Sequence, residues 1–99
     1  MLYVRLCIDK PGTTELRELH RADHRAYFKP NLSEDAAVRL VQAGPLCISD
    51  SDDTNLASFM IIEAPSLEDV ERFHKGDPFT AAGLYEKVYI HRWDRHISR

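Results

Sequence analysis

The sequence predicts an α+β fold of the ferredoxin-like, split βαβ type, with a four-stranded antiparallel sheet and helices on one face. Two observations favour this fold. Segments with alternating apolar residues, typical of strands, are separated by segments whose apolar residues recur every three or four positions, typical of helices. Their order is strand, helix, strand, strand, helix, strand, with a short extra helix after each long one. A chain of 99 residues has room for one core, so we expect a single domain over residues 1–99.

The first half of this pattern begins with a strand at residues 2–8. Leu2, Val4, Leu6 and Ile8 share one face, and the other face holds Tyr3, Arg5 and Cys7. Residues 9–12 form a turn, and Thr13 or Thr14 can start a helix that runs to about Phe28. Its expected apolar stripe is Leu16, Leu19, Asp23, Ala26 and Tyr27, and beside the stripe lie His20, His24 and Phe28.

The middle of the chain predicts a shorter helix over residues 33–43, which Ser33 caps and the Gly44-Pro45 pair ends. The apolar side of this helix would be Ala37, Leu40 and Val41. A short strand at residues 46–48 and an acidic loop at 49–55 follow. The clearest strand is residues 57–64.

The last third predicts a helix that Ser66 caps, with Asp69 three residues later. Its inward residues would be Leu67, Val70, Phe73 and His74. A very short helix at residues 77–83 comes next, because Asp77 is a good N-cap, Pro78 fits the first helical position and Gly83 fits the left-handed residue after the last turn. The final strand should run over residues 84–94.

Composition excludes several classes of protein. A net charge of −3 argues against nucleic acid as a partner, and no apolar run approaches the ~20 residues that span a bilayer. The first residues carry no secretory signal, so we expect a cytoplasmic protein. In that compartment Cys7 and Cys47, which both lie in apolar strand-like surroundings, should be buried and reduced.

The topology leaves one face of the sheet without helices. Aromatic residues from the first and last strands could occupy this open face: Tyr3, Tyr89 and Trp93. A large aromatic patch is unusual on a monomer. We therefore expect a homodimer whose sheets pack face to face.

Two residues could carry chemistry. His24 is a candidate general acid or base, because imidazole exchanges a proton near neutral pH. Asp77 has two interpretations: it caps its helix and nothing more, or it also orients the His24 ring. His20 and His24 have the i, i+4 spacing of a metal-binding pair, but no third ligand is evident, so we predict no metal site.

The chain resembles the YciI-like (YCII-related) family. The resemblance rests on four features: the start Met1-Leu2-Tyr3-Val4, the place of His24 in the first helix, Ala43-Gly44-Pro45-Leu46, and the segment Gly76-Asp77-Pro78-Phe79-Thr80-Ala81-Ala82-Gly83-Leu84-Tyr85-Glu86. It implies a dimeric α+β barrel with His24 and Asp77 as the catalytic pair. Some relatives remove hydrogen halide from chlorinated aromatic compounds. Two features depart from the family pattern: a longer segment around Pro30-Asn31 and the basic tail with Arg92, Arg95 and Arg99.

Together these observations predict an enzyme that needs no cofactor and carries out isomerisation or elimination on a small cyclic or aromatic-derived substrate. His24 would move the proton and Asp77 would hold its ring. The residues expected to line the cleft are Phe28, Leu46, Phe79 and Tyr85. Two alternatives stay open: a module that binds a metabolite without converting it, and a purely structural dimer.

Overall fold

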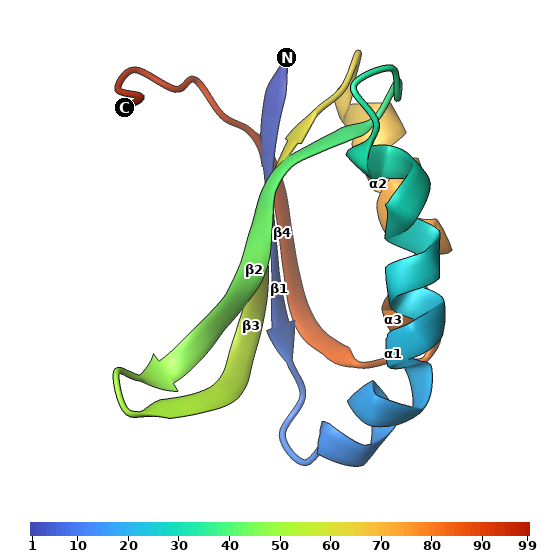
Figure 1. Ribbon diagram of the computed structural model, residues 1–99, viewed down its shortest axis with the longest axis vertical. Helices are drawn as coiled ribbons and strands as arrows, with labels where there is room; N and C mark the ends of the chain where they lie inside the picture. The colour runs from blue at the N-terminus through green and yellow to red at the C-terminus, as the bar shows by residue number, and fades with distance from the viewer.

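The computed structural model describes residues 1–99 and contains one four-stranded sheet with its helices on one side (Figure 1). The strands are β1 (Leu2–Asp9), β2 (Arg39–Ser49), β3 (Asp52–Glu63) and β4 (Tyr85–Arg92). The helices are α1 (Thr14–Phe28), the 3-10 helix η1 (Lys29–Leu32), α2 (Leu67–Gly76) and α3 (Pro78–Ala81). None of them is long and apolar enough to cross a membrane.

The strand order is β2-β3-β1-β4, and every neighbouring pair is antiparallel. This order confirms the predicted ferredoxin-like, split βαβ fold. β1 is a central strand that pairs with β3 on one side and β4 on the other. Side chains from β1 that point toward the helices therefore lie at the centre of the molecule.

The predicted helix over residues 33–43 is wrong. Only η1 follows α1, and strand β2 begins at Arg39 and runs through Gly44 and Pro45. The reason is pairing: Leu40 lies opposite Ile62 of β3, and β-branched Val38 and Val41 favour an extended chain. Pro45 is tolerated inside this strand because β2 is at the edge of the sheet.

The predicted acidic loop is shorter than expected. Strand β2 continues to Ser49 and β3 starts at Asp52, so only two residues connect them. The two strands form a hairpin whose tip bends away from the helices (Figure 1). Cys47 on this hairpin is exposed, which corrects the prediction of two buried cysteines; Cys7 is fully buried.

Tyr3 lies on the opposite face of β1 from the one that the sequence predicts. Tyr3, Arg5 and Cys7 face the helices and are buried, whereas Leu2, Val4, Leu6 and Ile8 lie on the open face. Tyr89 is on the open face, as predicted, opposite Leu6. Alternation separates two sets of residues, but it does not say which set the helices cover.

The core lies between the sheet and α2. It contains Tyr3, Leu40, Met60, Ile62, Ala64, Val70 and Phe73. Ser66 caps α2 as predicted, since its hydroxyl accepts a hydrogen bond from the Asp69 N–H at 3.2 Å. Helix α1 is different: it contains no buried residue, and Leu19 of its expected apolar stripe is 73% exposed.

Candidate active site

A short segment between α2 and α3 positions the central carboxylate of the site. Asp77 has an extended backbone (φ −64°, ψ 124°), which is the conformation favoured before a proline. Helix α2 therefore ends at Gly76 and α3 begins at Pro78. Oδ1 of Asp77 accepts the Phe79 backbone N–H at 3.0 Å, so the residue caps α3. Gly83, with φ +73°, ends this turn before β4.

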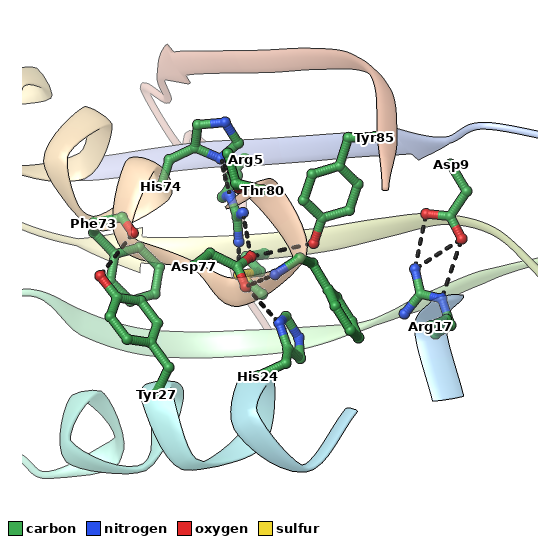
Figure 2. A network of polar contacts seen from close by, with 12 residues as sticks. Arg5, Asp9, Arg17, His24, Tyr27, Phe73, His74, Asp77, Thr80 and Tyr85 are labelled. Atoms are coloured by element: carbon green, nitrogen blue, oxygen red, sulfur yellow. Dashed lines mark hydrogen bonds and ion pairs between the residues drawn. The ribbon is translucent and has the colours of Figure 1, made fainter. Parts of the chain in front are cut away.

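The same carboxylate also contacts His24. Nδ1 of His24 lies 2.7 Å from Oδ1 of Asp77, and Asp77 is completely buried. Its second oxygen, Oδ2, accepts hydrogen bonds from Arg5 Nη2 at 2.7 Å and from the Tyr85 hydroxyl at 3.2 Å. Figure 2 shows these side chains converging on Asp77. Capping and contact with His24 are therefore compatible, because each uses a different part of the acceptor capacity of one carboxylate.

The surroundings of Asp77 keep it ionised. Burial alone would raise its pKa, but the hydrogen bonds from His24 and Arg5 and the charge of Arg5 outweigh burial and lower the pKa to about 2. An ionised carboxylate can only accept hydrogen bonds, so the proton between the two groups is on Nδ1 of His24. The other ring nitrogen, Nε2, has no partner within the protein.

Arg5 is the residue of this network that the sequence prediction missed. It is completely buried, and its three donor nitrogens have separate partners: Nε with His74 Nδ1 at 3.0 Å, Nη1 with Met60 Sδ at 3.4 Å, and Nη2 with Asp77. A signal was present, because Arg5 alternates with Tyr3 and Cys7 on a strand. A charge at such a position must find a counter-ion in the core.

His74 belongs to this network as a neutral acceptor. Burial, followed by the charge of Arg5, lowers the pKa of His74 to about 4, against a weaker opposing effect of Asp77. Its Nδ1 can then accept from Arg5 Nε. No group of three or more histidine, cysteine, aspartate or glutamate side chains in the structure is placed to hold a metal ion.

The His24 ring lies at the wall of a cavity. It stacks on Phe79 with ring centroids 3.8 Å apart and meets the edge of Phe28 at 4.1 Å. The cavity has a volume of about 520 Å³ and lies between α1 and the β2–β3 pair. Besides these three residues it is lined by Arg17, Arg21, Arg25, Leu32, Leu40, Ala43, Gly44, Pro45, Asn55, Ser58, Phe59 and Met60.

The four residues predicted to line the cleft fall into two groups. Phe28 and Phe79 line the cavity. Leu46 lies further along β2, outside its lining, and Tyr85 lies behind Asp77. Burial raises the pKa of the Tyr85 hydroxyl, so this group stays protonated and donates a hydrogen bond to Asp77. That hydroxyl orients the carboxylate and is not directed at the cavity.

The chain is thus a small split βαβ protein in which a buried arginine–aspartate pair holds a histidine at the wall of a pocket. The chain belongs to the YCII-related family, whose domain matches residues 1–94. It is 38% identical over 94 residues to Protein YciI from Escherichia coli, a match that covers 91% of this chain and 93% of that protein.

Two solved structures are similar. The first is 5-chloro-2-hydroxyhydroquinone dehydrochlorinase (TftG) from Burkholderia phenoliruptrix, in complex with 2,5-dihydroxybenzoquinone. It is 32% identical with a TM-score of 0.82, and the match covers 97% of this chain and 96% of that one. The second is PA3566 from Pseudomonas aeruginosa, at 19% identity and a TM-score of 0.54 over 97% of this chain and 93% of that one. PA3566 supports the fold alone.

Proposed function

We propose that this protein is a small-molecule enzyme in which His24 exchanges a proton with a substrate held in the cavity. One observation carries the proposal: His24 Nδ1 is 2.7 Å from a buried, ionised Asp77, while the same ring lines a cavity of about 520 Å³. This arrangement fixes the ring and its tautomer and leaves Nε2 as the atom that can accept a proton.

The chemistry that suits this arrangement is elimination or isomerisation. In an elimination, His24 Nε2 takes a proton from an O–H or C–H of the substrate. The electron pair left behind forms a new double bond, and a halide leaves with the electrons of its own bond. The imidazolium then returns its proton to water, so the net change is loss of hydrogen halide. In an isomerisation the proton goes back to another atom of the substrate.

The relative with a bound ligand supports an aromatic-derived substrate. By its name, TftG is a dehydrochlorinase of a chlorinated hydroxyhydroquinone, and it is 32% identical to this chain over nearly its whole length. In this chain Phe28, Phe79 and Met60 give the cavity apolar surfaces of the kind that pack against a planar ring. As part of the proposal, we therefore expect the substrate of this protein to be a small aromatic-derived compound.

Chloride release from 5-chloro-2-hydroxyhydroquinone tests the proposal directly. We expect turnover by the native protein and a loss of roughly 10²–10⁴-fold in kcat for His24→Gln, the range typical of positioned acid–base catalysis. His20→Gln is the matched control, because His20 lies one turn away on α1 but does not line the cavity. Equal turnover by the native protein and His24→Gln would refute the proposal. Binding of 5-chloro-2-hydroxyhydroquinone without any release of chloride would favour a metabolite-binding module instead.

We also propose that the protein is a homodimer. The open face of the sheet is apolar at Leu2, Val4, Leu6, Ile8, Phe59 and Tyr89, and no helix covers it. Continuous apolar patches of this kind are rarely left in water. A second copy of the same sheet can cover this surface, because most homodimers pair the same patch of both subunits about a two-fold axis.

A further inference from the structure

The wall of the cavity carries an unusual concentration of positive charge. Arg17, Arg21 and Arg25 all line it, whereas none of its lining residues is an aspartate or glutamate. The chain as a whole has a net charge of −3, so this concentration is contrary to the overall balance. Asp77 does not neutralise the cavity, because it is completely buried behind His24 and paired with Arg5.

The three arginines form a row on one face of α1. Residues four positions apart are neighbours on a helix surface, each displaced by about 6 Å along the axis. Like charges at this spacing weaken a helix by a few tenths of a kcal/mol per pair. Repulsion within the row therefore works against the helix, and only ion pairs with other residues can offset it.

The three guanidinium groups are not equally free. Arg17 makes a two-nitrogen ion pair with Asp9, at 2.8 Å for its closest contacts, and lies 4.8 Å over the Phe79 ring. Arg21 pairs only with Glu18 at the exposed helix surface, where its own side chain is 39% exposed. Arg25 makes no ion pair with any carboxylate and is exposed. Arg25, then Arg21, are thus the groups with donors to spare.

We infer that the cavity takes an organic anion: a planar ring that carries a carboxylate or an ionised ring oxygen. The ring would lie against Phe28 and Met60, and the charged oxygen would accept hydrogen bonds from Arg25 and Arg21. Guanidinium groups suit such oxygens because they can donate two parallel hydrogen bonds. This inference names the substrate class of the proposed active site and so rests on the proposed function.

A pair of probes of similar shape and different charge tests the inference. 2,5-Dihydroxybenzoate is an anion, and 2,5-dihydroxybenzamide is its neutral counterpart of nearly the same shape. We expect calorimetric titration to show at least tenfold tighter binding of the carboxylate to the native protein, with the preference shrinking as salt is added. Arg25→Gln should remove most of this preference without weakening binding of the amide, and Arg25→Lys should retain part of it.

Arg72→Gln is the matched control, since Arg72 is an exposed arginine of α2 outside the cavity, and it should leave both affinities unchanged. Equal affinity of the two probes, or no binding of either at millimolar concentration, would overturn the inference. So would an unchanged preference in Arg25→Gln. Failure of the proposed function is a separate result: it would appear as His24-independent turnover, whatever the charge preference of the cavity.

Discussion

At the scale of single residues, the Asp77 carboxylate uses its whole capacity to accept hydrogen bonds. Its two oxygens accept from His24, Phe79 N–H, Arg5 and Tyr85, which come from four different parts of the chain. Asparagine caps a helix nearly as well as aspartate, so Asp77→Asn should cost little if Asp77 only caps its helix. The structure changes this expectation. An amide would place an NH₂ group against donors and would leave the Arg5 charge buried without a counter-ion.

We therefore predict that Asp77→Asn lowers the free energy of unfolding by about 3–5 kcal/mol, the loss typical of breaking a buried ion pair. Urea denaturation followed by circular dichroism measures it. Asp35→Asn is the control, because Asp35 is exposed and makes no ion pair, and it should stay within about 0.5 kcal/mol of the native protein. A loss of less than about 1 kcal/mol for Asp77→Asn would mean that Arg5 does not depend on this carboxylate.

His74 predicts a pH dependence of stability. Its pKa is about 4 in the folded protein and near 6.5 when unfolded. Between these values the unfolded chain binds a proton that the folded chain does not. Stability should therefore be full above pH 6.5 and fall as the pH decreases toward 4, by up to about 3 kcal/mol at about 1.4 kcal/mol per pKa unit.

Thermal unfolding measured between pH 4 and pH 7 checks this dependence. His74→Gln can keep an acceptor for Arg5 but cannot be protonated, so its stability should vary less over this range. His96→Gln is the control, since the His96 side chain is 79% exposed on the C-terminal tail. If His74→Gln loses stability with acid as steeply as the native protein, the effect comes from other groups.

The two proposed catalytic residues could be identified from the sequence, but Arg5, which pairs with the other oxygen of Asp77, could not. A histidine on a helix edge and an Asp-Pro pair at a helix start are visible in a one-dimensional pattern. The Arg5–Asp77 contact joins residues 72 positions apart and depends on which face of β1 the helices cover. Alternation leaves that choice open, which is why the expected place of Tyr3 on the open face is wrong and why the pattern does not single out Arg5.

At the scale of elements, the end of α2 depends on the absence of a side chain at Gly76. A Cβ at this position would lie 2.9 Å from Tyr27 Cζ of α1 and closer still to its hydroxyl. That hydroxyl donates to the Phe73 carbonyl at 2.9 Å and joins α1 to α2. Close approach of a neighbouring aromatic ring, not an unusual backbone angle, requires glycine here.

We predict that Gly76→Ala destabilises the protein by about 1–3 kcal/mol, the usual cost of an added carbon atom in a tightly packed place. The Tyr27 ring would have to move and its hydrogen bond to Phe73 would break. Chemical denaturation of Gly76→Ala, and of Gly76→Ala combined with Tyr27→Phe, measures this effect. The second variant lacks the clashing hydroxyl, so part of the cost of the alanine should disappear. Native-like stability of Gly76→Ala would contradict the prediction.

The elements that the sequence predicted well are those with local signals. Ser66, Asp77 and Gly83 mark helix ends through their own backbone or side-chain chemistry, and each occupies its expected place. The first part of β2, residues 39–45, escapes the prediction because its pairing with β3 is a long-range property, whereas residues 46–48 are correctly expected to form a strand. Leu40 and Val41 fit the apolar side of a helix as well as a strand, and the Gly44-Pro45 pair resembles a helix end, so local signals favour the wrong element here.

At the scale of the whole molecule, the open sheet face predicts the oligomeric state. Sedimentation should give a species of about twice the 11.4 kDa chain mass at micromolar concentration. Leu6→Glu should shift it to the monomer, because Leu6 is central on this face, opposite Phe59 and Tyr89. Leu19→Glu is the control: Leu19 is 73% exposed on α1, on the other side of the sheet. A native monomer at these concentrations would contradict the prediction.

The overall topology was predictable because it follows from the order of elements more than from their lengths. Moving the start of β2 from residue 46 to Arg39 and losing one predicted helix leave the strand order unchanged. The cavity was harder to foresee. Helix α1 lines the cavity with arginines and aromatic rings and buries no residue of its own. An amphipathic helix, as the sequence predicts here, would instead bury an apolar stripe against the sheet.

The position of Pro45 in an edge strand affects how readily the protein can aggregate. Strand β2 is eleven residues long, lies at the edge of the sheet and is exposed over most of its length. Such an edge is a template on which further chains can add strands and grow into insoluble fibrils. Proline has no N–H to offer an incoming strand, and Gly44 beside it adds little β propensity. The Gly44-Pro45 dipeptide therefore makes this stretch of the edge a poorer template for an added strand.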